Sequence, residues 1–240
     1  MTAPYWLNIH DPTDFPDVNL ALTDPDGLLA IGGDLTEERL LTAYRNGIFP
    51  WYNEDQPILW WSPDPRAVLF PDNLRISKSL RKKLRRQVFT VRFDTAFEQV
   101  VRACAEPRVD QNGTWISEEM YEAYVRLHQA GHAHSVECWQ NDRLVGGLYG
   151  ISIGQIFFGE SMFSRVTDAS KVAFVYLVKH AAAKGFPLID CQVSSDHLAS
   201  LGADDIDRSV FVTYLNQYCS KEGWPGLWQL DFNVEQSILA

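Results

Sequence analysis

Three polar residues in the second half of the chain are candidates for acid–base chemistry. Glu160 follows two phenylalanines and a glycine in FFGESMFSR, at the expected end of a strand, and Asp190 and Gln192 stand two apart in LIDCQV. A carboxylate beside apolar side chains is partly removed from water, which tunes its pKa. Residues two apart in a strand share one face, so Asp190 and Gln192 are expected side by side. Together they can orient or deprotonate an amine.

Each of these residues also has a structural interpretation. Glu160 can cap a turn or pair with Arg165, which follows it by five positions. Asp190 and Gln192 can form a buried polar network that fixes their strand, because buried polar groups are costly unless they are hydrogen-bonded. The residue types and spacing alone leave both interpretations open.

A basic segment and two loop tryptophans favour contact with nucleic acid. The segment RISKSLRKKLRR carries seven basic residues and no acid, and the remaining chain has 14 basic against 31 acidic residues. Ile76, Leu80 and Leu84 form one apolar stripe of a predicted helix, so the basic side chains face solvent, where they either bind phosphates or only solvate the helix. Trp51 and Trp115 can stack on a base or pack in the interior. The basic residues are Arg75, Lys78, Arg81, Lys82, Lys83, Arg85 and Arg86.

Several other chemistries lack their motifs. His132, His134 and His197 have no third ligand at a metal spacing, so no metal site is predicted. The serine-hydrolase motif G-x-S-x-G is absent, and the turn SRVTDASK has no glycine with which to approach the pyrophosphate of coenzyme A. No cysteine pair has C-x-x-C spacing, no apolar run approaches the roughly 20 residues of a membrane span, and the start does not resemble a secretory signal. We therefore expect a cytoplasmic protein, and a monomer as the simplest state.

The elements that must position these residues follow an α+β pattern. Helices are predicted at about 36–46, 75–86, 117–130 and 168–184, with Asp34 and Glu37 fitting a cap for the first. Residues 132–159 alternate as an antiparallel meander, and 187–193 form a buried strand. The order β-β-β-α-β predicts an acetyltransferase-like mixed sheet with packed helices. Turn signals before Pro63 and Pro65 predict a small N-terminal α/β domain at 1–64 and a catalytic domain at 65–240.

Together these motifs resemble the leucyl/phenylalanyl-tRNA protein transferase family, over roughly residues 27–218. The resemblance is carried by GLLAIGGDLTEERLLTAYRNGIFPW, PILWWSPDPRAVL, GTWI, AYVRLHQAGHAHSVE, LVGGLYG, GESMFSR, ASK and LIDCQVSSDHLASLGA. It implies that the chain moves Leu, Phe or Met from aminoacyl-tRNA to the N-terminal Arg or Lys of an acceptor protein, which marks that protein for degradation. It also implies that no metal or nucleotide cofactor is used.

The resemblance further implies roles for particular residues. Trp51 and Trp115 match tryptophans that hold the 3′ adenosine of the tRNA, while Glu160, Asp190 and Gln192 match the reaction centre. The pocket for the transferred side chain is implied at Leu148, Phe157, Met162, Leu177 and Ile189. This pocket departs from the family pattern, because Leu148 replaces a methionine and Leu177 and Ala181 replace phenylalanines. The departures leave the preference between Leu and Phe open.

The chemistry of the reaction agrees with this interpretation. An aminoacyl ester is already activated, so positioning a neutral acceptor amine can supply much of the rate. Asp190 with Gln192 is the candidate to orient and deprotonate that amine, whereas Glu160 either holds the amino group of the transferred residue or assists proton transfer. Two rivals are a peptidoglycan-bridge aminoacyltransferase, which usually needs a doubled domain, and a non-catalytic adaptor that binds N-terminal degrons or tRNA.

Overall fold

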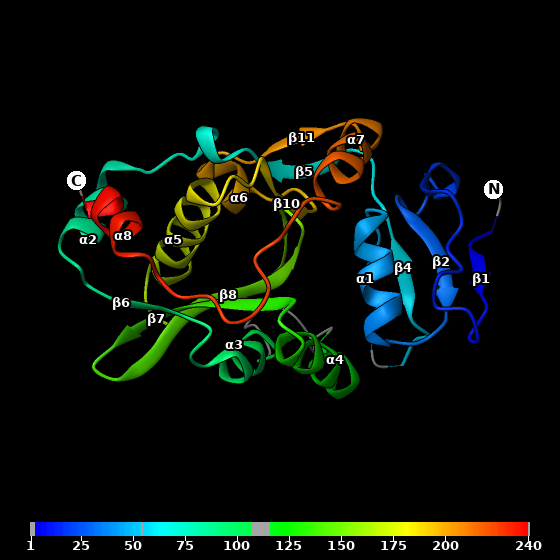
Figure 1. Ribbon diagram of the computed structural model, residues 1–240, viewed down its shortest axis with the longest axis horizontal. Coiled ribbons are helices and arrows are strands. Elements are labelled where there is room, and N and C mark those ends of the chain that lie inside the picture. Colours follow the sequence, from blue (N-terminus) through cyan, green and yellow to red (C-terminus); the bar gives the residue numbers. More distant parts are fainter. Residues whose placement is uncertain (1–2, 54, 107–115, 240) are drawn as a thin grey trace.

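Two β-sheets organise the computed structural model, which describes residues 3–53, 55–106 and 116–239. The smaller sheet has the order β1-β2-β4-β3 (Tyr5–Leu7, Leu28–Gly32, Leu59–Trp61 and Phe49–Pro50), and helix α1 (Glu37–Arg45) follows β2. Figure 1 shows this sheet at one end of the molecule. The predicted first helix is therefore confirmed, together with a small α/β unit at the start of the chain.

The larger sheet has seven strands in the order β11-β5-β10-β9-β8-β7-β6. Their bounds are Asp204–Ile206, Arg66–Leu69, Leu188–Gln192, Ile156–Ser164, Arg143–Ile153, Ala133–Gln140 and Thr90–Phe93. Strands β7, β8 and β9 form the predicted antiparallel meander, and β9 pairs parallel with β10. The predicted α+β class and β-β-β-α-β order are confirmed, in agreement with an acetyltransferase-like arrangement.

Helices pack on the larger sheet, which separates two apolar cores. The helices are α2 (Lys78–Arg85), α3 (Phe97–Cys104), α4 (Glu118–Gln129), α5 (Ala169–Ala183), α6 (Asp196–Leu201), α7 (Arg208–Tyr218) and α8 (Phe232–Leu239). Neighbouring strand residues alternate between the cores, since Phe157 packs in the core of α5 and Phe158 in the core shared with α1 and α4. No helix in the described part of the chain is long and apolar enough to cross a membrane.

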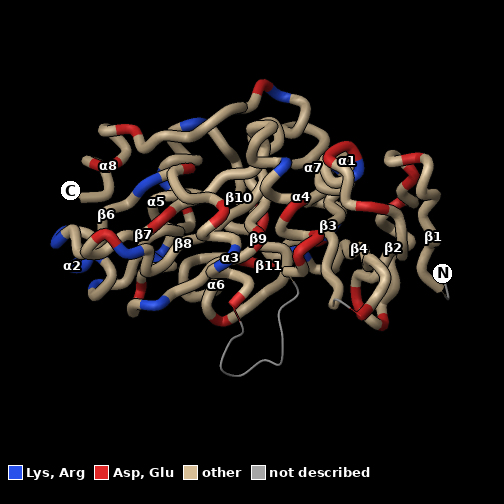
Figure 2. The backbone as a smooth tube through the Cα atoms, turned by 90° about the horizontal axis from the view of Figure 1, so that it is seen from below, with Lys and Arg blue, Asp and Glu red and all other residues tan. Residues whose placement is uncertain are grey.

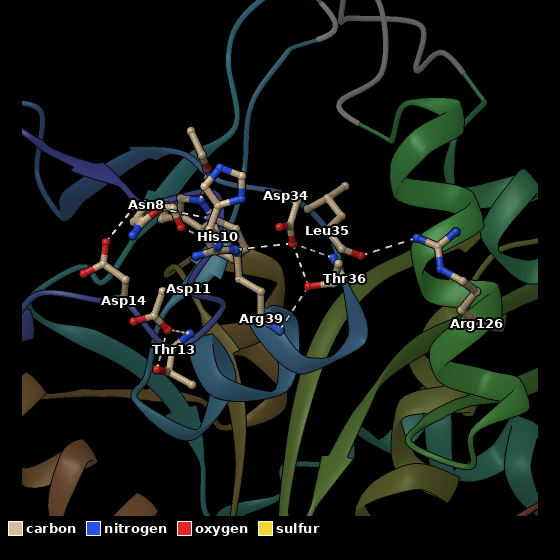
Figure 3. A network of polar contacts seen from close by, with 12 residues as sticks. Asn8, His10, Asp11, Thr13, Asp14, Asp34, Leu35, Thr36, Arg39 and Arg126 are labelled. Carbon is tan, nitrogen blue, oxygen red and sulfur yellow. Dashed lines mark hydrogen bonds and ion pairs between the residues drawn. The ribbon is translucent and has the colours of Figure 1, made fainter.

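A polar network holds α1 against both the small sheet and α4 (Figure 3). Thr36, and not Asp34, caps the helix by accepting from the amide of Arg39; Asp34 supports the cap by accepting from the amide and hydroxyl of Thr36. The buried Arg39 donates to Asp34 at 3.3 Å and to the carbonyl of Asn8 at 2.9 Å. Arg126 of α4 donates to the carbonyl of Leu35 at 3.4 Å. The network therefore fixes where α1 lies relative to the larger sheet.

Two helix predictions need small corrections of their starts. Helix α2 begins at Lys78 after a Ser77 cap that accepts from the amide of Leu80, so Ile76 lies before the helix and only Leu80 and Leu84 form its buried stripe. Helix α4 begins at Glu118 after the capping Ser117. In both cases a serine hydroxyl satisfies an amide of the first turn, which sets the boundary.

Candidate active site

The site lies where β9 and β10 stop pairing. The last paired residues are Asp190 and Phe158, whereas β9 continues to Ser164 through its pairing with β8. Glu160 therefore lies inside β9 and not at a strand end, which corrects the sequence prediction. The unpaired edge of β9 beyond Phe158 borders a cavity that β10 would otherwise close.

Two backbone irregularities aim the polar side chains at this point. In the pairing of β8 with β9, Tyr149 faces Ser161 and Gly150 faces Gly159, which leaves Glu160 as the extra residue of a bulge. A second shift in register falls between Asp190 and Gln192, and Gln192 has a φ of 63°. A bulge redirects a side chain, and a non-glycine residue in the left-handed region costs about 1–3 kcal/mol, so such features concentrate at functional sites.

The carboxylate of Glu160 is the centre of a hydrogen-bonded cluster. Its Oε1 accepts from the Tyr44 hydroxyl at 2.7 Å and from the Gln192 amide at 2.7 Å, and its Oε2 accepts from the Tyr124 hydroxyl at 2.5 Å. The two hydroxyls are themselves 2.9 Å apart. Arg165, the ion-pair partner considered from the sequence, instead pairs with Glu106.

Burial and hydrogen bonding act in opposite directions on the pKa of Glu160. Three oxygen-to-oxygen contacts join Glu160, Tyr44 and Tyr124, and the two hydroxyls bring only two hydrogens, so all three contacts are hydrogen bonds at once only while the carboxyl group is protonated and donates to one of the hydroxyls. Burial raises the pKa of Glu160 to about 7, and the charge of Asp190 adds to this, whereas the donors Tyr124, Tyr44 and Gln192 oppose it. Glu160 can therefore exist in both protonation states at pH 7.

The sequence analysis missed Tyr44 and Tyr124. Both are fully buried, and burial with the nearby charge of Glu160 raises their pKa well above the usual value, so both stay protonated as donors. Tyr44 comes from α1 and Tyr124 from α4, so the cluster joins the small unit to the larger sheet. The available signal was their place inside two of the motifs that carry the resemblance, TAYRNG and AYVRLH.

Asp190 has a different partner, Arg66, which the sequence analysis also missed. The Arg66 guanidinium donates to both carboxylate oxygens, at 2.8 and 2.7 Å, and both side chains are buried. Arg66 also donates to the carbonyl of Gly47 and lies over the rings of Phe49 and Phe211. The amide of Gln192 donates to Asp190 at 2.9 Å. Both oxygens are thus occupied, which favours a positioning role over a role as base.

The five apolar residues implied for the side-chain pocket line one cavity of about 760 Å³. Glu160 and Asp190 also line it, together with Phe174, Cys191 and Leu198. Ala181 is buried in the α5 core but does not line this cavity. The cavity therefore combines an apolar wall with the carboxylate of the bulge. The stretch FFGESMFSR contributes both, through Phe157 and Met162 in the wall and through Glu160. The five residues are Leu148, Phe157, Met162, Leu177 and Ile189.

The other predicted residues that the structure describes do not line the cavity. Trp51 follows β3 with 47% of its surface exposed, its ring 5.9 Å from that of Trp61, and Trp115 lies outside the described residues. Lys83 turns toward α5 and pairs with Asp168 at 2.7 Å, and Arg75 precedes the basic helix. Figure 2 shows basic positions gathered at α2. One surface groove is lined by Lys78, Arg81, Lys82, Arg85 and Arg86.

Comparison with known proteins places the chain in a family. The sequence model described as leucyl/phenylalanyl-tRNA protein transferase matches residues 68–216, and the model of the N-terminal domain of that family matches residues 33–64. The chain belongs to the leucyl/phenylalanyl-tRNA protein transferase family. The matched segments include both tyrosines and both carboxylates of the site. Arg66 lies in the short gap between the two matched segments.

Relatives named leucyl/phenylalanyl-tRNA--protein transferase match along nearly the whole chain. The relative from Aromatoleum aromaticum is 59% identical, covering 93% of this chain and 94% of its own. That from Hydrogenovibrio crunogenus is 55% identical, covering 99% and 93%, and that from Cellvibrio japonicus is 60% identical, covering 86% and 87%. A solved structure of L-PGS from Bacillus licheniformis has a TM-score of 0.38 at 13% identity, covering 88% of this chain and 64% of its own, too low to carry an argument.

The raised pKa of Glu160 has a measurable effect on stability. Its pKa rises from 4.5 to about 7 on folding, so below pH 4.5 the stabilisation by the bound proton is fully present. Between pH 4.5 and 7 the unfolded chain releases this proton first, and the free energy of unfolding falls by up to about 3 kcal/mol. Urea unfolding of wild type and Glu160→Gln at pH 4.5 and 8 measures this loss, which the variant should lack. Equal losses in both proteins would contradict the assignment.

Proposed function

We propose that the chain transfers Leu or Phe from aminoacyl-tRNA to the N-terminal Arg or Lys of an acceptor protein, with the reaction centre at Glu160. As a member of this family, the chain is an aminoacyltransferase that uses aminoacyl-tRNA and a protein acceptor. The single observation that supports this centre is that the apolar cavity and the Glu160 cluster adjoin. The cavity receives the transferred side chain, with Met as a further substrate, because apolar slots discriminate weakly between similar chains.

The proposed reaction needs only positioning and one proton carrier. The neutral acceptor amine attacks the carbonyl carbon of the aminoacyl ester, a C–N bond forms, and the bond from that carbon to the ribose oxygen breaks. The ionised carboxylate of Glu160 takes a proton from the attacking amine and returns it to the leaving ribose oxygen. A pKa of about 7 suits both transfers, because neither protonation state is then strongly favoured.

In this mechanism Gln192 and Asp190 have positioning roles. Gln192 donates to Glu160, so one of its two amide hydrogens holds the carboxylate, and its side-chain carbonyl oxygen would accept from the amine. Asp190 fixes the backbone of Gln192 and is itself held by Arg66. We therefore assign Asp190 to orienting the amide and Glu160 to proton transfer.

The charge distribution supports a division of substrates along the molecule. Residues 1–64 hold eleven acidic and two basic residues, whereas α2, which carries the basic groove, lies at the opposite end of the molecule (Figures 1 and 2). The groove would bind tRNA phosphates without reading sequence. The acidic unit would attract an acceptor with a basic N-terminus. We further propose that Trp51 and Trp115 stack on the 3′ adenosine of the tRNA. We also propose that the chain acts as a monomer with two domains, residues 1–64 and 65–240.

The direct test supplies tRNA charged with labelled leucine or phenylalanine and a peptide that begins with Arg. Label is expected to enter this peptide but not the same peptide with an acetylated N-terminus, because acetylation removes the nucleophilic amine. Peptides beginning with Lys and Ser test the acceptor specificity. Binding of tRNA and peptide without any transfer would favour the adaptor instead, and transfer to Ser as efficient as to Arg would contradict the proposed acceptor.

Two single-charge variants test the groove on α2. Arg81→Gln removes a groove residue and is expected to weaken tRNA binding and to lower the slope of log K against log salt by about 0.9. Lys83→Gln is the matched control, because it removes the same charge from a side chain that pairs with Asp168. Both slopes are measured by binding titrations between about 50 and 200 mM salt, because phosphate contacts make the affinity strongly salt-dependent over this range. Equal changes of slope in the two variants would show that tRNA binding depends on the net charge of the protein and not on the groove.

A further inference from the structure

One buried tryptophan distinguishes the C-terminal segment. Between Cys219 and Phe232, Trp228 is the buried residue, at 4% exposure, and every other residue of this segment is partly or fully exposed. The segment follows α7 and leads to α8, and it lies beyond residue 216, where the match to the family ends. A single buried side chain therefore anchors a segment that lies beyond the part matched by the family model.

Four aromatic rings surround the indole of Trp228. His134 stacks on it with ring centroids 4.0 Å apart, and His180 lies at 5.0 Å. Phe186 meets it edge-on at 6.1 Å, and Phe157 lies at 5.8 Å. The indole thus fills the space between strands β7 and β9 and helix α5, on the side of the sheet where the α5 core lies.

Hydrogen bonds fix the position of this indole. The backbone amide of Trp228 donates to Oδ2 of Asp94 at 2.6 Å, the oxygen that also contacts Nδ1 of His134 at 2.8 Å. The other oxygen of Asp94 accepts from the amide of Ser135 at 2.7 Å. The indole nitrogen donates to the carbonyl of Trp224 at 2.9 Å. The C-terminal segment is therefore tied to β7 at the position where its indole is buried.

Phe157 connects the indole to the cavity. This ring is fully buried and lines the cavity together with Leu177 and Ile189. It also presses on Gly150, where an added Cβ would lie 2.6 Å from two of its ring atoms. Phe157 therefore lies against Gly150 and Trp228 and also forms part of the cavity wall. Closely packed rings transmit a change of volume to their neighbours.

We propose that Trp228 is a positioning and specificity-determining residue. By packing against Phe157, it keeps that ring toward the cavity and so sets the depth of the aminoacyl pocket. This inference rests on the proposed function, since it takes the cavity as the pocket for the transferred side chain. A smaller residue at position 228 lets Phe157 retreat and deepens the pocket. The kcat/KM for the larger phenylalanyl donor then rises relative to that for the leucyl donor.

The test measures kcat/KM for leucyl-tRNA and phenylalanyl-tRNA with one acceptor peptide. Trp228→Leu is expected to raise the Phe-to-Leu ratio at least about threefold, an indirect effect smaller than the roughly 10–200-fold that one methylene of pocket space can produce. Trp228→Phe retains a ring against Phe157 and should give a smaller shift in the same direction. Circular dichroism and thermal unfolding establish which variants are folded, and Trp228→Phe decides alone if Trp228→Leu does not fold.

Two controls separate the possible failures. Trp224→Phe changes an exposed tryptophan of the same segment and should leave the ratio unchanged. Leu177→Phe narrows the cavity directly and should lower the ratio. If Leu177→Phe acts but folded Trp228 variants reduce both donors equally, Trp228 has only a structural role and the inference is overturned. If Leu177→Phe also leaves the ratio unchanged, the pocket assignment itself is overturned.

Discussion

Replacing Asp190 with alanine is expected to lower the free energy of unfolding by about 3–5 kcal/mol, apart from any effect on transfer. The reason is Arg66, whose guanidinium would remain buried without the carboxylate that now accepts both of its hydrogen bonds. Its remaining contacts, with one carbonyl and two aromatic rings, do not neutralise its charge. Urea unfolding of wild type and variant measures the loss directly.

The same variant should also lose transfer activity, and a second variant separates the two effects. The double variant Arg66→Met with Asp190→Leu removes both buried charges, and such replacement often restores stability. We expect its stability to return toward wild type while its activity stays low, because the amide of Gln192 has lost its acceptor. Recovery of activity along with stability would show that Asp190 only compensates the charge of Arg66. An Asp190→Ala variant as stable as wild type would contradict the ion pair.

The elements that could be predicted are those whose signals are local. Ser117 precedes two glutamates and an apolar stripe, and the helix begins immediately after it, because a hydroxyl satisfies the amides of the first turn. Neighbouring residues of a strand face opposite sides of the sheet, so a strand at this position is enough to separate Phe157 from Phe158, as the two cores show. The five pocket residues were implied by the family resemblance, and alternation alone does not bring them together: Phe157 and Met162 are five positions apart and share one face of β9 only because the bulge at Glu160 shifts the register.

The parts that could not be predicted depend on contacts between distant residues. Tyr44 and Glu160 are 116 positions apart, and Arg66 and Asp190 are 124 apart, so no periodic pattern joins them. Arg66 follows two prolines in the sequence and gives no local sign of being buried. The bulge that makes Glu160 an extra residue comes from its pairing with β8, which the sequence of β9 alone does not determine.

The second large effect is expected at Glu160 itself. Glu160→Gln keeps an oxygen that accepts from one tyrosine and presents an NH2 group to the other, but it cannot take a proton from the amine, so kcat is expected to fall about 10²–10³-fold. The neutral amide also avoids a buried unpaired charge, and the fold should be retained. Single-turnover transfer with saturating aminoacyl-tRNA measures the chemical step, and equal tRNA affinity in both proteins shows that the donor still binds.

The pH dependence of this step distinguishes proton transfer from simple binding. If ionised Glu160 is the base, the wild-type rate rises with pH through about 7, the pKa of its carboxyl group. The acceptor amine titrates at about 7.7–8.0 in both proteins, so the ratio of wild-type to Glu160→Gln rates cancels it and isolates Glu160. A ratio that is constant with pH would restrict Glu160 to holding the substrate.

The tyrosine next to this carboxyl group gives the sharpest form of the test. The hydrogen bond from Tyr124 lowers the pKa of Glu160, so Tyr124→Phe should raise that pKa further and move the rise in rate to higher pH. A structural role for Tyr124 would reduce the rate at every pH without moving the profile. The shift requires both that Glu160 is the titrating group and that the hydroxyl from α4 contacts it. An unmoved profile in a folded variant would exclude this pairing as the source of the pH dependence.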